Sequence, residues 1–128
     1  MAEASGRDPS GERLPRGRRI TRSREIRELF QRGKRSRTAH LDVLVSASPA
    51  SFSRVGFVVP RHKHSAVDRN LVKRRLKEVA RQEVLPRLDR AGLTLDVLIR
   101  ARREAYDTGF AEYRRELMTW TEGVCSRA

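Results

Sequence analysis

The stretch R-N-L-V-K-R-R-L-K-E-V-A-R, which runs from Arg69 to Arg81, predicts a helix with a cationic arc and an adjoining apolar arc. At 100° per residue, Asn70 and five cations fall within about 140° of one another. These cations are Arg69, Lys73, Arg74, Lys77 and Arg81. The apolar arc contains Val72, Leu76, Val79 and Ala80. Such a helix can bury one side in a core and keep its charges in solvent.

An ordinary solvated face is the alternative explanation of this basic run. Solvated faces normally mix charge signs at i, i+4, whereas Arg69, Lys73, Lys77 and Arg81 are four successive like charges that repel one another. An anionic ligand would relieve that repulsion. Asn70 can hydrogen-bond to a base edge, a ribose hydroxyl or backbone, so the pattern favours a helix that contacts nucleic acid.

The composition also indicates a polyanionic partner. Its 29 Lys and Arg against 16 Asp and Glu give a net charge of +13 and a pI near 11.4. Arginine far outnumbers lysine, which suits RNA because guanidinium binds phosphate bidentately and stacks on bases, but a GC-rich genome explains the bias equally well. No apolar stretch approaches about 18 residues and no signal-peptide region is present, so we expect a soluble cytoplasmic protein that binds no membrane.

Cysteine and histidine usage gives no sign of a metal or catalytic centre. The single Cys125 excludes an intramolecular disulfide and a Cys-based zinc cluster. His40, His62 and His64 lack a convincing third ligand, and they form no nuclease-type constellation with carboxylates. We therefore expect neither a metal ligand set nor a catalytic residue in this chain.

Three elements are predicted before the basic helix. Ile26, Leu29 and Phe30 indicate an amphipathic helix that Ser23 caps and Gly33 ends. After a basic turn at 34–37, residues 38–47 alternate as a half-buried strand with one core face. Residues 55–59 predict a second strand, which we expect to pair with the first as an antiparallel neighbour. The basic helix itself is expected to be capped by Asp68 and to end near residue 85, before Pro86.

Two further elements complete the predicted fold. The run L-T-L-D-V-L-I-R-A-R, residues 93–102, predicts a central strand parallel to 55–59. A last helix, capped by Asp107 or Thr108, would place Phe110, Tyr113, Leu117 and Trp120 in the core. The predicted class is α/β, an α+β two-layer sandwich with one small mixed sheet and element order α-β-β-α-β-α. A sheet covered on one face would leave a groove beside the first helix, where we expect an extended ligand.

The length allows a single modest core. Residues 1–13 combine Gly, Pro, Ser and charge without periodicity and are predicted to be a disordered tail. We predict one domain over residues 14–122 and a short tail over residues 123–128.

At this point the residues resemble a known family, the protein component of bacterial ribonuclease P, which accompanies a catalytic RNA in removing the 5′ leader of precursor tRNA. The resemblance covers about residues 13–122. Its most specific part is A-V-x-R-N-x-x-K-R-x-x-K, here Ala66, Val67, Arg69, Asn70, Lys73, Arg74 and Lys77. Supporting pieces are Arg13-Leu14, I-x-x-x-F-x-x-G from Ile26, V-G-F-V-V from Val55, and D-x-x-x-x-A-R from Asp96.

The resemblance implies a left-handed strand-helix-strand crossover, against the usual right-handed rule. It implies that the basic helix and the loop before it bind RNA through Arg61, Lys63, Arg69, Asn70, Lys73, Arg74 and Lys77; Arg81 joins them on helical geometry alone. It also implies a leader-binding cleft with Ile26, Phe30 and Leu44. Ile26 and Leu44 stand where members often carry aromatic rings, so base stacking would rest mainly on Phe30.

The resemblance further implies a division of labour. The partners would be the ribonuclease P RNA subunit and precursor tRNA, with no obligate protein partner. The RNA subunit would carry out the hydrolysis with Mg²⁺, and this chain would bind the leader, assist its removal and broaden the substrate range. The alternatives are a general or ribosome-associated RNA-binding protein without a role in cleavage, and a metal-dependent nuclease that acts alone.

Overall fold

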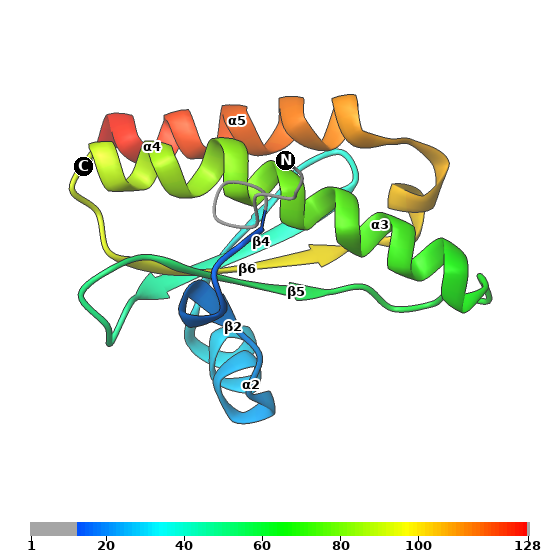
Figure 1. Cartoon of the computed structure of the whole chain (residues 1–128), viewed down its shortest axis with the longest axis horizontal. Coiled ribbons are helices and arrows are strands. Elements are labelled where there is room, and N and C mark those ends of the chain that lie inside the picture. Colours follow the sequence, from blue (N-terminus) through cyan, green and yellow to red (C-terminus); the bar gives the residue numbers. More distant parts are fainter. Residues whose placement is uncertain (1–12, 128) are drawn as a thin grey trace, which may run out of the picture.

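The computed structural model describes residues 13–127, and its centre is a mixed sheet of five strands in the order β2-β5-β6-β4-β3 (Figure 1). β6 (Leu95–Ala101) is the middle strand, antiparallel to β4 (Leu41–Ala47) and parallel to β5 (Arg54–Val58). The edges are β3 (Lys34–Arg37), antiparallel to β4, and β2 (Arg19–Ile20), parallel to β5. The central position predicted for the third strand is therefore confirmed, as is its parallel pairing.

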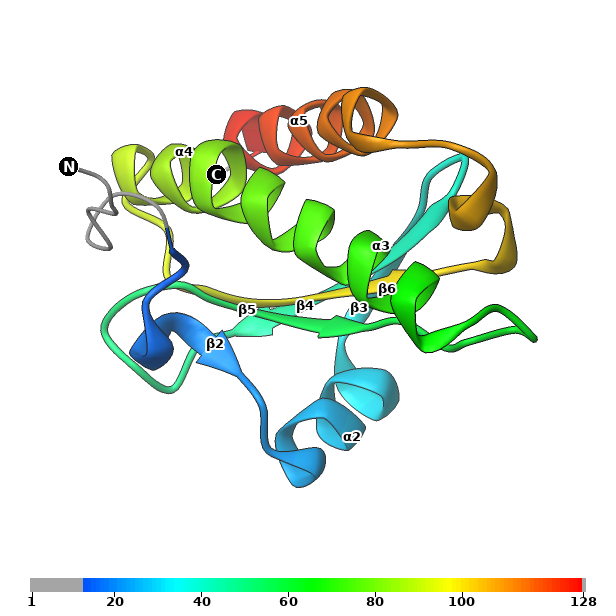
Figure 2. The ribbon, with the colours of Figure 1, turned by 45° about the vertical axis from the view of Figure 1, so that its right-hand side comes forward.

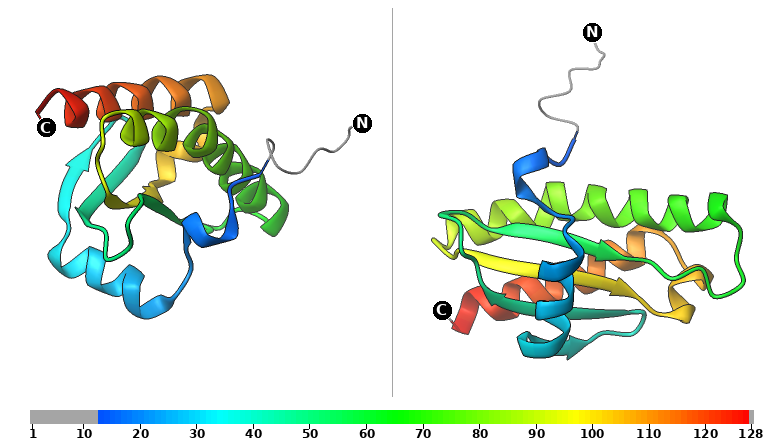
Figure 3. Two further views of the ribbon diagram at one scale, coloured as in Figure 1. Left: turned by 60° about the vertical axis from the view of Figure 1, so that its left-hand side comes forward. Right: turned by 90° about the horizontal axis from the view of Figure 1, so that it is seen from below.

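The predicted antiparallel pairing of the first two strands is wrong, because β6 lies between β4 and β5. The connection from Ala47 to Arg54 is longer than the tight two-residue turn that forces neighbouring strands to pair, so it can span the width of one strand. β5 reaches β6 through the long helix on one face of the sheet. Seen from below, both strands point the same way with that helix behind them, which makes the crossover left-handed (Figure 3).

The predicted basic turn at 34–37 is the edge strand β3. Its four residues, K-R-S-R, carry no apolar alternation, and charged side chains are tolerated there because an edge strand has one side in solvent. The two-residue strand β2 also has no sequence signal. It follows a short 3₁₀ turn, η1 (Arg16–Arg18), and brings Ile20 against Gly56, where a Cβ would lie only 2.9 Å from the Ile20 carbonyl oxygen.

The basic helix differs from its prediction at both ends. α3 (Ala66–Val79) begins three residues earlier than expected because Ser65 is its N-cap, whose Oγ accepts a hydrogen bond from the Asp68 N–H at 3.1 Å. Pro86 does not end the helix. A π-helical turn, η2 (Ala80–Val84), in which the Leu85 N–H donates to the Ala80 carbonyl, leads into α4 (Leu85–Arg90). Pro86 thus stands in the first turn of α4, where a missing N–H is tolerated.

The last helix, α5 (Phe110–Arg127), follows a 3₁₀ turn, η3 (Arg103–Asp107). It begins beyond both predicted caps. Of the predicted stripe, Tyr113, Leu117 and Trp120 are buried, and Phe110 is half-buried and packs against the core. The predicted tail over 123–128 is wrong for residues 123–127, because α5 runs to Arg127 and packs Val124 and Cys125 against the core. The predicted tail at 1–13 falls outside the described residues, apart from Arg13.

Helices lie on both faces of the sheet (Figure 2). α3, α4 and α5 cover one face over the main core, while α2 (Ser23–Arg32) crosses the other over a small cluster of Ile20, Leu29, Leu44 and Leu98. The first helix was predicted between Ser23 and Gly33, but Arg22 rather than Ser23 occupies the N-cap position. Residues 41–44 of β4 are all buried, so the prediction of a single core face is wrong: α2 shields Leu44 from the second side.

Candidate nucleic-acid interface

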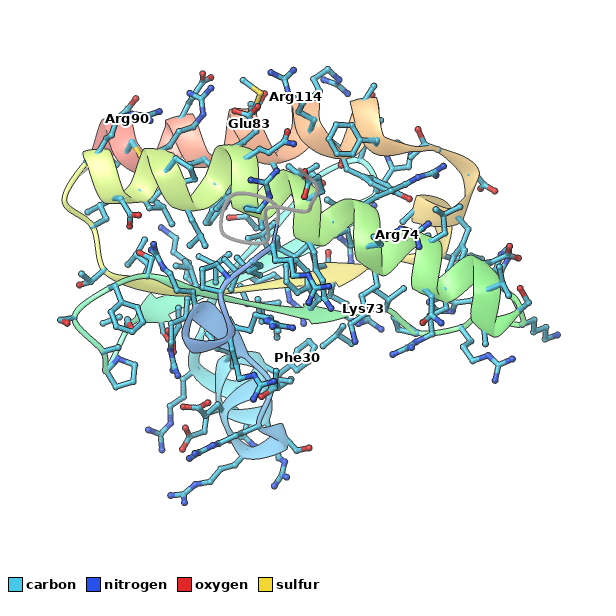
Figure 4. All side chains as sticks on the ribbon, viewed as in Figure 1. Phe30, Lys73, Arg74, Glu83, Arg90 and Arg114 are labelled. Atoms are coloured by element: carbon cyan, nitrogen blue, oxygen red, sulfur yellow. The ribbon has the colours of Figure 1, made fainter. Side chains whose placement is uncertain are left out.

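Two of the predicted RNA-binding lysines of α3 line a depression together with residues of the segment before α2. Lys73 and Lys77 line a depression of about 190 Å³ whose apolar wall includes Ile20, Ile26 and Phe57. Thr21 and the guanidinium-bearing Arg19 complete its lining. Lys73 is labelled in Figure 4, between α3 and the upper end of α2. The helix predicted to bind phosphate and the helix predicted to flank the cleft therefore contribute to one site.

A second depression, of about 370 Å³, adjoins the first because Arg19 and Lys77 line both. Its other lining residues are Arg13, Leu14, Arg74 and Glu78. We call the two depressions together the α3 groove. Five of its lining side chains are cations and one is a carboxylate, and it has an apolar floor at one end. This combination suits a chain that carries both phosphates and bases.

Electrostatic repulsion inside the α3 groove is visible at Lys77. Partial burial, and then the neighbouring charges of Lys73 and Arg19, hold the pKa of the Lys77 ammonium below its usual value. Arg19 is itself short of partners, since its buried Nε meets no hydrogen-bond acceptor among the described residues. A bound anion would offset the repulsion at Lys77 and could accept a hydrogen bond from the Arg19 Nε. Arg19 was not among the predicted site residues, because a two-residue strand gives no pattern by which to place it.

The loop before α3 is held in a defined shape. His62 and Lys63 have positive φ angles of 48° and 72°, a conformation that non-glycine residues rarely adopt. The His64 ring stacks on Tyr106 with centroids 3.9 Å apart, and the Tyr106 hydroxyl donates to the Pro60 carbonyl at 2.6 Å. Burial is the main cause that raises the pKa of that hydroxyl, which keeps it protonated as a donor.

The other predicted RNA-binding residues of the loop and helix differ in exposure and in their contacts with the protein. The side chains of Arg61, Lys63 and Asn70 are exposed, and the Arg61 Nε donates to the His64 carbonyl at 3.3 Å. Arg69 is half-buried and its Nε donates to the Val59 carbonyl at 2.7 Å, which ties the start of α3 to the end of β5. Arg69 thus has a structural contact in addition to any ligand contact.

Arg81 is paired with a carboxylate of its own helix. It lies in the π-helical turn and forms an ion pair with Glu78 at 2.5 Å, and it lines neither depression. The hydrogen bond from Arg81 is the main cause that lowers the pKa of Glu78. The helical wheel assumed a uniform 100° per residue, which a π turn does not keep. A role for Arg81 in binding RNA stays a prediction from helical geometry.

The predicted cleft residues divide into two accessible side chains and one buried side chain. Ile26 and Phe30 are half-buried on α2. Leu44 is only 1% exposed, packed in the cluster under α2, so the prediction that it contacts a ligand is wrong for this structure. α2 rests on this position, which the alternating pattern assigned to solvent.

His40 has closer acidic neighbours than the sequence suggested. Its Nδ1 lies 2.5 Å from Glu116 and 3.9 Å from Glu112, and one ligand atom from each residue fits within 4.8 Å of the others. His40 was not grouped with the two glutamates from sequence because it lies more than 70 positions before them. Glu116 already accepts hydrogen bonds from the Thr38 hydroxyl and the His40 N–H, so the cluster fastens the 38–40 turn to α5.

Comparison with known proteins identifies the family of this chain. The ribonuclease P family model matches residues 14–124. The chain belongs to the ribonuclease P protein family. It is 33% identical over 104 residues to the ribonuclease P protein component of Syntrophus aciditrophicus, covering 81% of this chain and 84% of the relative. It is 36% identical over 113 residues to that of Micrococcus luteus, covering 80% and 84%.

Solved structures of ribonuclease P proteins share the fold. The protein from Staphylococcus aureus aligns with a TM-score of 0.69 at 19% identity, covering 84% of this chain and 94% of that one. The protein from Thermotoga maritima aligns with a TM-score of 0.68 at 24% identity, covering 82% and 96%. As a member of this family, the chain is a protein subunit of the ribonucleoprotein endoribonuclease ribonuclease P, involved in 5′ processing of precursor tRNA. Within residues 13–127, no helix is long and apolar enough to cross a membrane.

Proposed function

We propose that this subunit binds the ribonuclease P RNA through the basic loop and α3, and guides the 5′ leader of precursor tRNA along the α3 groove and beside α2. The observation that carries the proposal is the continuity of the groove. Arg19 and Lys77 join its two depressions, and Ile26 supplies an apolar wall beside Lys73. Phosphates would contact the cations, and bases would pack on the apolar wall and on Phe30.

In this proposal the chain neutralises phosphate repulsion between two RNAs, which lowers the Mg²⁺ concentration that cleavage requires and broadens the range of precursors cleaved. Mg²⁺ would serve the RNA subunit. The His40, Glu112 and Glu116 cluster does not fit Mg²⁺, which prefers oxygen ligands and keeps several waters, because it contains a ring nitrogen and its buried carboxylate is already hydrogen-bonded within the protein. We assign the hydrolysis to the RNA subunit and no catalytic residue to this chain.

Binding of precursor tRNA, a cytoplasmic location and the lack of an obligate protein partner stay predictions. A general RNA-binding protein would present a similar basic surface, and a nuclease that acts alone would cleave without RNA. Both alternatives differ from the proposal in what they predict for cleavage.

The test is cleavage of a 5′-extended precursor tRNA by ribonuclease P RNA at low Mg²⁺, with the RNA alone, the protein alone and both together. We expect cleavage only when both are present. Lys73→Ala with Lys77→Ala should weaken precursor binding by about tenfold or more, because two phosphate contacts are lost. Arg90→Ala, on the exposed end of α4, is the control for loss of charge.

Three results would contradict the proposal. Unchanged affinity and rate in the lysine double variant would exclude the α3 groove. RNA binding without rescue of cleavage would indicate a general RNA-binding protein, and cleavage by the protein alone would show that the catalytic group lies in this chain.

A further inference from the structure

A second basic surface lies outside the α3 groove, at the end of the sheet where β5 and β6 finish. The register places Arg37, Asp42 and Arg100 side by side across β3, β4 and β6. Asp42 lies two residues before Leu44, so this row shares the sheet face on which α2 lies. α2 crosses that face nearer its other end and leaves this end open (Figure 1).

Asp42 is a buried carboxylate surrounded by arginines. It is 1% exposed, and its Oδ1 accepts from the Arg37 Nε and the Arg102 Nη1, each at 3.3 Å. Its Oδ2 has an ion-pair contact with the Arg100 Nη1 at 3.5 Å but no hydrogen bond. The carboxylate therefore fixes the positions of guanidinium groups whose remaining donors can face outward.

The three arginines around Asp42 differ in what remains available. Arg102 is committed to the fold, because its Nη1 and Nη2 donate to the carbonyls of Thr38, Leu41 and Ala39 at 2.6 to 2.9 Å. Apart from the bond that the Arg37 Nε donates, the side chains of Arg37 and Arg100 make no hydrogen bond within residues 13–127. Their side chains are 67% and 34% exposed. Two guanidinium groups are thus oriented by Asp42 and open to an anion.

These side chains line an open depression of about 350 Å³ together with His62, Arg102, Arg103 and Glu104. Four arginines there face two carboxylates, Asp42 and Glu104, so the surface keeps a positive charge. His62 reaches it from the basic loop with a positive φ, and its buried Nε2 has no hydrogen-bond partner among the described residues. Backbone strain and an unpaired ring nitrogen at one place are typical of a ligand site.

We propose that Arg37 and Arg100, oriented by Asp42, bind a backbone phosphate of single-stranded RNA that continues past Phe30 along the sheet. This inference rests on the proposed function, since the RNA would be either the precursor's leader or a segment of the RNA subunit. The depression is lined mainly by arginines, whose donors suit a phosphate. A phosphate contact carries no sequence information, so losing it should weaken the binding of leaders of different sequence alike.

The test is a triple variant, Arg37→Gln, Asp42→Asn and Arg100→Gln, in the reconstituted holoenzyme. Replacing Asp42 together with its partners avoids leaving a buried carboxylate without its counter-charges. The triple variant lowers the net charge by one, because two cations and one anion are lost. Arg90→Gln lowers it by the same amount and is the matched control. Thermal unfolding of each variant checks that the fold is kept.

We expect the triple variant to bind a long-leader precursor about five- to tenfold more weakly, with the slope of log affinity against log salt shallower by about 0.7 for one lost single-strand phosphate contact. A loss that disappears when the leader is shortened identifies the leader as the ligand. An equal loss for the RNA subunit alone identifies the subunit. If the triple variant binds both RNAs as Arg90→Gln does, the inference is wrong; if the Lys73 and Lys77 double variant is also unchanged, the proposed function fails with it.

Discussion

The two faces of the sheet differ in what they bury. The face under α3, α4 and α5 packs a large apolar cluster, with Leu76, Leu88 and Tyr113 fully buried. Among the described residues, the face under α2 packs four buried apolar side chains, and at its open end arginines surround a carboxylate. Burial of apolar area dominates stability. The difference indicates that the face under α3, α4 and α5 supplies most of the apolar stabilisation, whereas much of the face under α2 presents charged side chains.

An ion-pair group fastens α2 to its face where apolar area is short. Arg54 on β5 donates to Asp96 on β6 at 2.7 and 3.0 Å and to Glu25 on α2 at 3.1 Å. The hydrogen bond to Asp96 is the main cause that raises the pKa of Arg54 above its usual value. α2 is therefore held by polar contacts that fix its direction as well as by Leu29.

The largest effect is expected from truncation in the main core. Leu76→Ala should lower the free energy of unfolding by about 3 to 5 kcal/mol, because a fully buried leucine leaves a cavity between α3 and the sheet. Leu29→Ala, in the small cluster, is the matched comparison and should cost less, about 2 to 3 kcal/mol. Urea denaturation measures both. Equal costs would show that the two faces contribute alike to stability.

A smaller effect is expected at the ion-pair group. Arg54→Met should cost about 1 to 3 kcal/mol, because it leaves the buried Asp96 without its partner. The pKa of Arg54 is raised on folding, so its contribution to stability is complete at any pH well below the pKa of an unfolded arginine, and the cost should stay constant between about pH 6 and 9. Urea denaturation across that range checks it. A cost that changes over these pH values would mean that another group is being titrated.

The smallest effect on stability is expected at Lys77, with the opposite sign. Its pKa is lowered on folding, so the unfolded chain binds more protons and stability rises with pH just below the usual value of 10.5. Lys77→Gln removes that repulsion and should stabilise the protein at neutral pH by less than about 1 kcal/mol, while weakening RNA binding several-fold. The gain should vanish as the pH approaches about 10. Loss of both stability and affinity would show that Lys77 is a packing residue.

The periodic elements of this fold could be predicted, and the parts set by single contacts could not. Each of the two long helices presents one continuous apolar stripe, so its buried side could be predicted. The stripe of α3 contains Val72, Leu76 and Val79, and that of α5 contains Tyr113, Leu117 and Trp120. The apolar run of β6 correctly indicated the central strand. β3 was missed because an edge strand needs no alternation, and the end of α3 was misplaced because a π turn accommodates Pro86.

The candidate site follows the same division. Lys73, Arg74 and Lys77 line the groove as one helical surface, which a periodic pattern can predict. Arg19 and the Arg37, Asp42 and Arg100 row depend on strand register and on a two-residue strand. Leu44 was assigned to the ligand because alternation cannot show that α2 covers the second face. Long-range pairing decided each of these positions.

The most direct test of the two-face account is hydrogen exchange of the full-length protein, free and bound to ribonuclease P RNA with a leader-bearing precursor tRNA. The account predicts added protection in the basic loop, the N-terminal half of α3, α2 and the β3 edge, with the outer surfaces of α4 and α5 unchanged. Protection confined to α4 and α5, with the α3 groove unaffected, would contradict it.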